Sequence, residues 1–77
     1  MYRGSIACLV NGETVNADYC VKSFDEGSEF GINGGRISKL TVKINNEYVA
    51  NYDREWDIKP TSEAAKIVLA SLIEKFN

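Results

Sequence analysis

Apolar and polar residues alternate in the N-terminal part of the chain, on both sides of an Asn-Gly pair. Asn11 and Gly12 are the residues that a two-residue type I′ hairpin turn prefers, because both of its central positions need a positive φ. With this turn Ile6 faces Ala17 across the ribbon. One side of the ribbon is then mainly apolar: Ile6, Cys8, Val10, Val15, Ala17, Tyr19 and Val21. This period of two predicts a sheet with one buried face.

The same register separates the two cysteines. Cys8 lies on the apolar side and Cys20 on the other, so the two thiols cannot bond without breaking the strand pairing. We expect two free thiols in a reducing compartment. The side that carries Cys20 is mostly polar, with Ala7 and Leu9 as its apolar members; its other residues are Arg3, Ser5, Asn16, Asp18 and Lys22.

A second ribbon is predicted around the pair Asn45-Asn46. A two-residue loop places Leu40 opposite Asn51, and a three-residue loop places Leu40 opposite Tyr52. The other pairs of the three-residue register are Ile44 with Tyr48, Val42 with Ala50 and Lys39 with Asp53. We favour the three-residue loop because it matches apolar with apolar residues and adds a cross-strand charge pair. It requires a left-handed conformation at Glu47.

The chain ends in a predicted helix that begins after Pro60. Thr61 or Ser62 can cap its first N–H groups, and Glu63 suits the positive end of its dipole. Apolar residues recur at helical spacing: Ala65, Val68, Leu69, Leu72, Ile73 and Phe76. The element order predicts an α+β fold in which a four-stranded antiparallel β-sheet of two hairpins (β-β-β-β-α) carries the C-terminal helix on one face. We expect residues 1–77 to form one domain.

Composition and charge narrow the function classes. The chain has 77 residues, no histidine and a formal net charge of −2. Histidine is the commonest general base and metal ligand, and a general nucleic-acid binder normally has a basic face. No apolar run reaches the about 18 residues of a transmembrane helix, and the N-terminus lacks the features of a signal peptide. We therefore expect a cytoplasmic protein without cofactor or metal that is not an enzyme.

The segment Phe24–Arg36 is longer than most links between neighbouring strands, which run to about 2–5 residues. Such loops are functional or compact excursions of the chain. Asn33, Gly34 and Gly35 supply positions that accept a positive φ. Apolar contacts come from Phe24, Phe30 and Ile32. This pattern predicts a folded loop rather than an open one.

Four interpretations of this loop differ in their chemistry. Its oxygen-bearing side chains could bind a hard cation, but the spacing of Asp25, Glu26, Ser28 and Glu29 fits no EF-hand. The glycines could cradle a phosphate, but the Gly-Lys-Ser/Thr ending of a P-loop is missing. We therefore interpret the loop as a solvated acidic excursion or as a surface for protein contacts.

Tyr52, Arg54 and Trp56 stand close together in the sequence. Tyr, Trp and Arg are enriched at binding hot spots, and an arginine can stack on a tryptophan ring. The alternative is structural: Tyr52 and Trp56 seal the end of a small core.

A carboxylate pair such as Glu29 and Asp53 could perform acid/base chemistry if the fold brought the two together. No serine or cysteine stands in a nucleophile motif.

Two strings, FDEGSEFGINGGRISKLTV and NYDREWDIKP, together with the short terminal helix, resemble a family of small uncharacterised bacterial and bacteriophage-associated proteins, a domain of unknown function. The resemblance covers roughly Tyr19 to Phe76. It implies a small cytosolic domain, often encoded near mobile elements, with no catalytic residues to transfer. That family usually has a glycine where this chain has Glu55. Because of this difference, the resemblance does not predict whether a tight turn precedes Trp56.

We therefore expect a small non-catalytic binding or accessory module that acts through a protein partner or through self-association, and not on a membrane. The expected binding residues are Asp25, Glu29, Phe30, Arg36, Tyr52, Arg54 and Trp56. One alternative is a nucleic-acid-binding accessory protein of a mobile element; we rank it second because of the net charge. It would use Arg3, Lys22, Lys39 and Lys43 on the outer sheet face, with stacking aromatics. The other alternative is a small metal-dependent enzyme.

Overall fold

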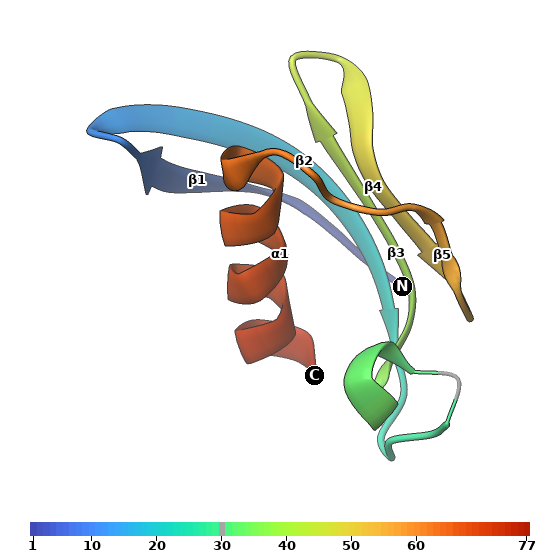
Figure 1. The fold of residues 1–77 in the computed structure, drawn as a ribbon. Helices are drawn as coiled ribbons and strands as arrows, with labels where there is room; N and C mark the ends of the chain where they lie inside the picture. Colours follow the sequence, from blue (N-terminus) through green and yellow to red (C-terminus); the bar gives the residue numbers. More distant parts are fainter. Residues whose placement is uncertain (30) are drawn as a thin grey trace.

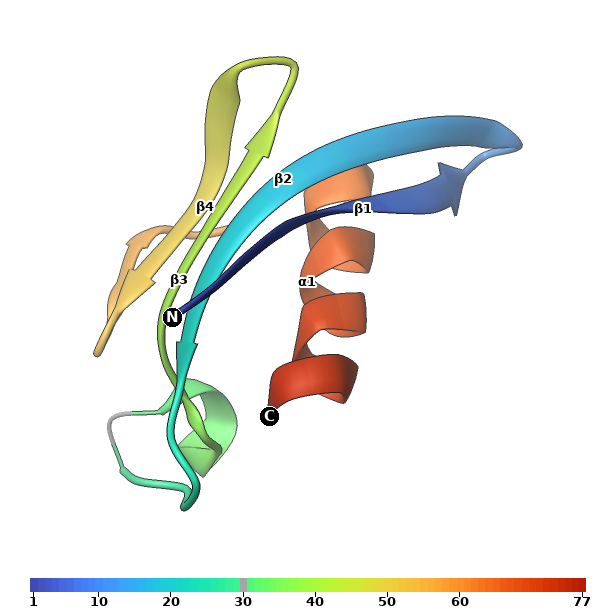
Figure 2. The ribbon, with the colours of Figure 1, turned by 180° about the vertical axis from the view of Figure 1, so that it is seen from behind.

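A computed structural model describes residues 1–29 and 31–77, in which one helix lies on one face of an antiparallel sheet (Figure 1). The sheet has five strands in the order β1-β2-β3-β4-β5, so every strand lies beside its neighbours in sequence. The elements are β1 (Tyr2–Val10), β2 (Glu13–Ser23), the 3-10 turn η1 (Ile32–Gly34), β3 (Ile37–Ile44), β4 (Glu47–Asp53), β5 (Trp56–Ile58) and α1 (Glu63–Phe76). Figure 2, from behind, shows the sheet face that the helix leaves uncovered.

The first hairpin is confirmed in turn and register. Asn11 and Gly12 have φ values of 52° and 83°, as a type I′ turn requires. Ile6 lies opposite Ala17, and the pairing continues without irregularity to Tyr2 and Val21. The apolar side of the ribbon therefore faces the core: Ala17 and Val21 are buried in it, and Ile6, Cys8 and Tyr19 pack against it.

The second hairpin combines the two predicted registers. Lys39 pairs with Asp53, and the pairs Leu40 with Tyr52 and Val42 with Ala50 follow the three-residue prediction. Beyond Val42 a bulge shifts the pairing, so that Ile44 lies opposite Glu47. The prediction that Ile44 pairs with Tyr48 is therefore wrong. The turn is therefore the two-residue type at Asn45 and Asn46, with φ values of 52° and 64°. The predicted left-handed conformation at Glu47 is wrong, because two asparagines take it instead.

This turn gives a stability prediction. Asn46→Ala should lower the free energy of unfolding by about 1 kcal/mol, because alanine in the left-handed region costs about 1–2 kcal/mol and asparagine tolerates that region. Asn46→Gly should leave the free energy unchanged or raise it slightly, since glycine has no such cost. Urea denaturation followed by circular dichroism measures both. Equal losses for the two variants would contradict the positive-φ explanation.

The prediction of four strands is corrected to five. After β4 the chain turns tightly and returns as β5, whose Trp56 pairs with Tyr52. Arg54 stands in the turn with a φ of 64°. The tight turn that the resemblance left open is therefore formed without a glycine. The three residues of β5 are too few to show an alternating pattern, so the sequence pattern did not predict this strand.

The helix begins as predicted, and its two ends are bonded to the β1–β2 turn and to the end of β2. Ser62 is its N-cap and accepts a hydrogen bond from the Ala65 N–H at 3.1 Å. Near the first hairpin, Asn11 Nδ2 donates to Glu63 Oε2 at 3.1 Å. The helix residues Ala65, Val68 and Leu72 are buried against the sheet, where the core includes Ala17, Val21, Ile37, Leu40, Val42, Ala50 and Tyr52. The C-terminal end of α1 lies beside the 24–36 loop (Figure 1).

Candidate binding surfaces

The 24–36 loop is folded by its own backbone. Phe24 N–H donates to the Arg36 carbonyl at 3.0 Å, and Ser28 N–H donates to the Gly35 carbonyl at 3.1 Å. Ile32 is buried in the core and gives the loop an apolar contact, as predicted. Phe24 does not anchor it: half of that side chain is exposed, and Lys22 Nζ lies 5.2 Å from its ring centre. Phe30, also predicted to give the loop an apolar contact and to bind a partner, lies outside the described residues.

Asn77 ties this loop to the end of the helix. Its side-chain Oδ1 accepts a hydrogen bond from Ile37 N–H, and its Nδ2 donates to the Ile32 carbonyl, both at 3.0 Å. A Cβ at Gly35 would overlap this side chain, and a Cβ at Gly31 would overlap the carbonyl oxygen of Gly35. The two glycines thus allow the backbone to pack closely. No sequence pattern indicates a role for Asn77, because its partners are backbone groups far away in sequence.

A hollow of about 270 Å³ opens between the loop and the C-terminal end of the helix. We call it the end hollow; it is lined by Tyr2, Ser23, Phe24, Asp25, Arg36, Lys75 and Phe76. The rings of Tyr2 and Phe76 stack with their centres 5.1 Å apart. Ser23 Oγ donates to the Phe76 carbonyl at 2.9 Å, which fixes the helix end beside β2. Two of the predicted binding residues, Asp25 and Arg36, therefore meet in one hollow.

Tyr52, Arg54 and Trp56 form a second group, at the β4–β5 turn. Tyr52 is buried, 7% exposed, and its ring meets the ring of Trp56 edge-on at 5.0 Å. The turn is held to the sheet because Arg54 N–H donates to the Ser38 carbonyl at 3.1 Å. Trp56 is partly buried and packs against the core, while Arg54 is exposed. Tyr52 thus lies within the core, and Trp56 covers its edge.

The predicted binding residues thus fall into two groups at the same end of the sheet. Asp25 and Arg36 line the end hollow, and Glu29 is exposed on the loop. The second group belongs to the β4–β5 turn. β2 ends, β3 begins and β4 ends at this same end, as Figure 1 shows. Sequence reasoning missed Tyr2, Lys75 and Phe76, which enter the end hollow from the two ends of the chain.

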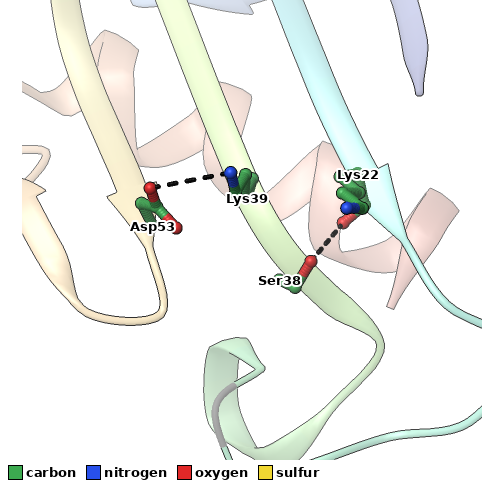
Figure 3. Close-up of polar contacts among 4 residues, drawn as sticks. All are labelled: Lys22, Ser38, Lys39 and Asp53. Atoms are coloured by element: carbon green, nitrogen blue, oxygen red, sulfur yellow. Dashed lines mark hydrogen bonds and ion pairs between the residues drawn. The ribbon is translucent and has the colours of Figure 1, made fainter.

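The uncovered sheet face, which we call the open face, collects basic residues. The register places four basic residues (Arg3, Lys22, Lys39 and Lys43) and two acidic residues (Asp18 and Asp53) on it. Lys43 Nζ lies 4.8 Å from the ring centre of Tyr48, which is 55% exposed. Figure 3 shows the ion pair of Lys39 with Asp53, at 3.8 Å, beside the Ser38 hydroxyl that donates to the Lys22 carbonyl at 3.4 Å. A hollow of about 330 Å³ crosses this face between Arg3 and Tyr48.

Among residues 1–29 and 31–77, no group of three or more His, Cys, Asp or Glu side chains lies close enough together to hold a metal ion. No helix in this part of the chain is long and apolar enough to cross a membrane. Cys8 and Cys20 are both free thiols, and the register places them on opposite faces of the sheet.

Comparison with known proteins agrees with the resemblance in one respect, that the chain matches a domain of unknown function. A family described as a domain of unknown function, DUF7678, matches residues 2–77. No curated protein and no solved structure matches the chain. Since the match spans β1 to the end of α1, it covers the whole sheet, the loop and the helix. The chain therefore belongs to the DUF7678 family, whose function is unknown.

Proposed function

We propose that the chain is a small non-catalytic module of bacterial or bacteriophage-associated origin, located in the cytoplasm, that binds a protein partner at the end hollow. The observation that carries this proposal is the meeting of three aromatic side chains, Tyr2, Phe24 and Phe76, around one hollow. They come from β1, the loop and α1. The two free thiols suit a reducing compartment, and the quoted motifs support the bacterial origin.

The aromatic walls supply the binding energy. Tyr2 is 56% exposed and Phe24 is 50% exposed, so a partner can still cover much of both rings. An aromatic side chain buries about 150–250 Å², and at about 25 cal/mol per Å² the exposed half of one ring contributes about 2–3 kcal/mol. This is a gross value, from which the ordering costs of association must be subtracted. Two such rings are enough for a hot spot.

The size and charge of the end hollow point to a peptide segment as its occupant. Its 270 Å³ falls just below the range of about 300–1,000 Å³ for pockets that enclose small molecules, and it suits one large side chain. Asp25, Arg36 and Lys75 place charges of both signs around the aromatic walls. Charges on a rim orient a partner more than they hold it. The expected partner is thus a segment with one aromatic or large aliphatic anchor between charged residues.

A displayed library of random peptides, selected on the immobilised protein, tests this function. We expect the selected peptides to share one large apolar residue flanked by charges. Phe24→Ala should weaken the binding of a selected peptide at least tenfold in calorimetry, because it removes one wall of the hollow. Arg36→Ala should weaken it less, since an exposed charge contributes less than a buried ring.

Tyr48→Ala is the matched control for Phe24→Ala. Both rings are about half exposed, and a lysine lies over each of them, but Tyr48 is on the open face. We expect Tyr48→Ala to bind the selected peptides like the wild type. A library that yields no binder, or a binder that loses affinity with Tyr48→Ala and not with Phe24→Ala, would contradict the end hollow as the site.

A second candidate function rests on the open face. The strand register brings Arg3, Lys22, Lys39 and Lys43 onto one surface, as the nucleic-acid alternative requires. The exposed ring of Tyr48 on this surface offers a place for a base to stack. This surface has two more basic than acidic residues, although the whole chain has a charge of −2. The favoured ligand would be a single strand, because unpaired bases can stack on side chains of an open sheet face.

Fluorescence anisotropy with a labelled single-stranded oligonucleotide tests the second function. If four phosphates are neutralised, the logarithm of the association constant should fall with the logarithm of salt concentration at a slope of about −3. Lys43→Glu should abolish binding at low salt, whereas Lys66→Glu, on the exposed side of α1, should reduce it only slightly. The absence of binding at low salt would exclude this function.

A further inference from the structure

The strand β1 is an edge strand with one free side. The turn at Asn11-Gly12 closes with a hydrogen bond between Val10 and Glu13, and hydrogen-bonded pairs then alternate along an antiparallel ladder. The even-numbered residues of β1 therefore bond to β2. The odd-numbered residues turn their N–H and C=O groups outward, away from the sheet: Arg3, Ser5, Ala7 and Leu9.

This edge lacks the features that usually prevent strands from pairing with other chains. Edge strands are normally short, bulged, or carry lysine or proline. β1 has nine residues, pairs with β2 without a bulge, and contains no proline and only one charged residue, Arg3. At the opposite edge of the sheet, β5 has three residues and Asp57 in its centre. Only the β1 edge is therefore long and regular enough to accept another strand.

We propose that β1 pairs antiparallel with β1 of a second copy, about a two-fold axis at Ile6, so that two sheets join into one. In this register Arg3 lies opposite Leu9 of the second copy, and Ser5 lies opposite Ala7. Each such pair exchanges two backbone hydrogen bonds through groups that point outward in the single chain. No like charges face each other, because Arg3 has an apolar partner.

The helix side of β1 fits the same arrangement. The even-numbered residues Tyr2, Ile6 and Val10 face the helix layer, and Ile6 is only partly buried in the single chain. In the proposed register Ile6 meets Ile6 of the second copy and Tyr2 meets Val10, so that the apolar layer continues across the junction. The strand thus complements itself on both faces, which favours a second copy over an unrelated strand. Tyr2 also lines the end hollow, so the two proposals share this residue, but the tests of the junction below use no ligand of the hollow.

Light scattering after size exclusion is the first test. We expect a mass of about 17 kDa, twice the 8.6 kDa of one chain, over a dilution series. Ala7→Pro removes an N–H group that points outward and leaves the bonds to β2 intact, so this variant should elute as a monomer with an unchanged circular dichroism spectrum. Ala7→Lys should also be monomeric. Asn16→Lys is the control, because it adds the same charge directly opposite Ala7 on β2.

Amide hydrogen exchange by NMR is the second test, and it separates edge pairing from other contacts. In the dimer the amides of Arg3, Ser5, Ala7 and Leu9 should be protected at least tenfold more than in the Ala7→Lys monomer. A wild-type protein that stays monomeric at every concentration overturns the proposal. So does a dimer in which these four amides exchange as fast as in the monomer, because the contact is then made by a face and not by the edge.

Discussion

Replacing Leu72 by alanine is expected to lower the free energy of unfolding by about 2–5 kcal/mol. Leu72 is fully buried, at 0% exposure, where α1 meets the sheet. Alanine leaves a cavity that the sheet and the helix cannot close, since residues from both belong to the same core cluster. For a chain of 77 residues this is a large share of the total stability. Urea denaturation followed by circular dichroism at equal protein concentration measures the change.

Glu74→Ala is the control for this variant. Glu74 is exposed and lies two residues further along the same helix. Alanine is a good helix former, so we expect a change within about 0.5 kcal/mol. A loss below about 1 kcal/mol for Leu72→Ala, or equal losses for the two variants, would mean that this side of the helix is not the buried one.

Replacing Asn77 by alanine is expected to cost about 1–3 kcal/mol of unfolding free energy. The change removes the acceptor of the Ile37 N–H and the donor to the Ile32 carbonyl. Ile37 is fully buried at 0% exposure, so its N–H would lose its partner in a place that water reaches poorly. The amide of Ile37 should then exchange faster with solvent, which NMR detects directly.

Asn16→Ala is the matched control for Asn77→Ala. Asn16 is exposed in the middle of β2, so the same chemical change there should stay within about 0.5 kcal/mol. If Asn77→Ala is as silent as Asn16→Ala, the helix end does not hold the loop. The explanation that Gly35 is needed to make room for the Asn77 side chain would then be contradicted as well.

The sheet and helix could be predicted from sequence wherever a local pattern decides the structure. Asn11-Gly12 determines a turn and, through it, the register of a whole ribbon. The helix stripe around Leu72 follows from a period of 3.6 residues. Both patterns involve residues close together in sequence, and each is long enough to exclude the alternative period.

Prediction failed where a single residue changes the pattern. The bulge beside Val42 shifts the pairing by one residue, so neither simple register describes the whole of β3 and β4. β5 is too short to show an alternation of apolar and polar residues. Arg54 has a φ of 64°, and no neighbouring residue type in the sequence predicts this positive value. These features depend on contacts such as that between Arg54 N–H and the Ser38 carbonyl.

The end hollow was only partly predictable for the same reason. Asp25 and Arg36 were found because the loop itself is unusual in length and composition. Tyr2 and Phe76 stand at opposite ends of the chain, and only the meander with the returning helix brings their rings together. A local sequence pattern cannot predict a contact between residues this far apart in the chain.

The fold and both binding surfaces depend most on which sheet face the helix covers, and methyl NMR measures this directly. We predict nuclear Overhauser effects from the methyl groups of Val68 and Leu72 to those of Val21, Leu40 and Val42, which share one buried cluster. Thr41 stands between Leu40 and Val42 on the open face, so its methyl group should show none to the helix. Contacts from Leu72 to Thr41 and none to Val42 would contradict the fold and both binding surfaces derived from it.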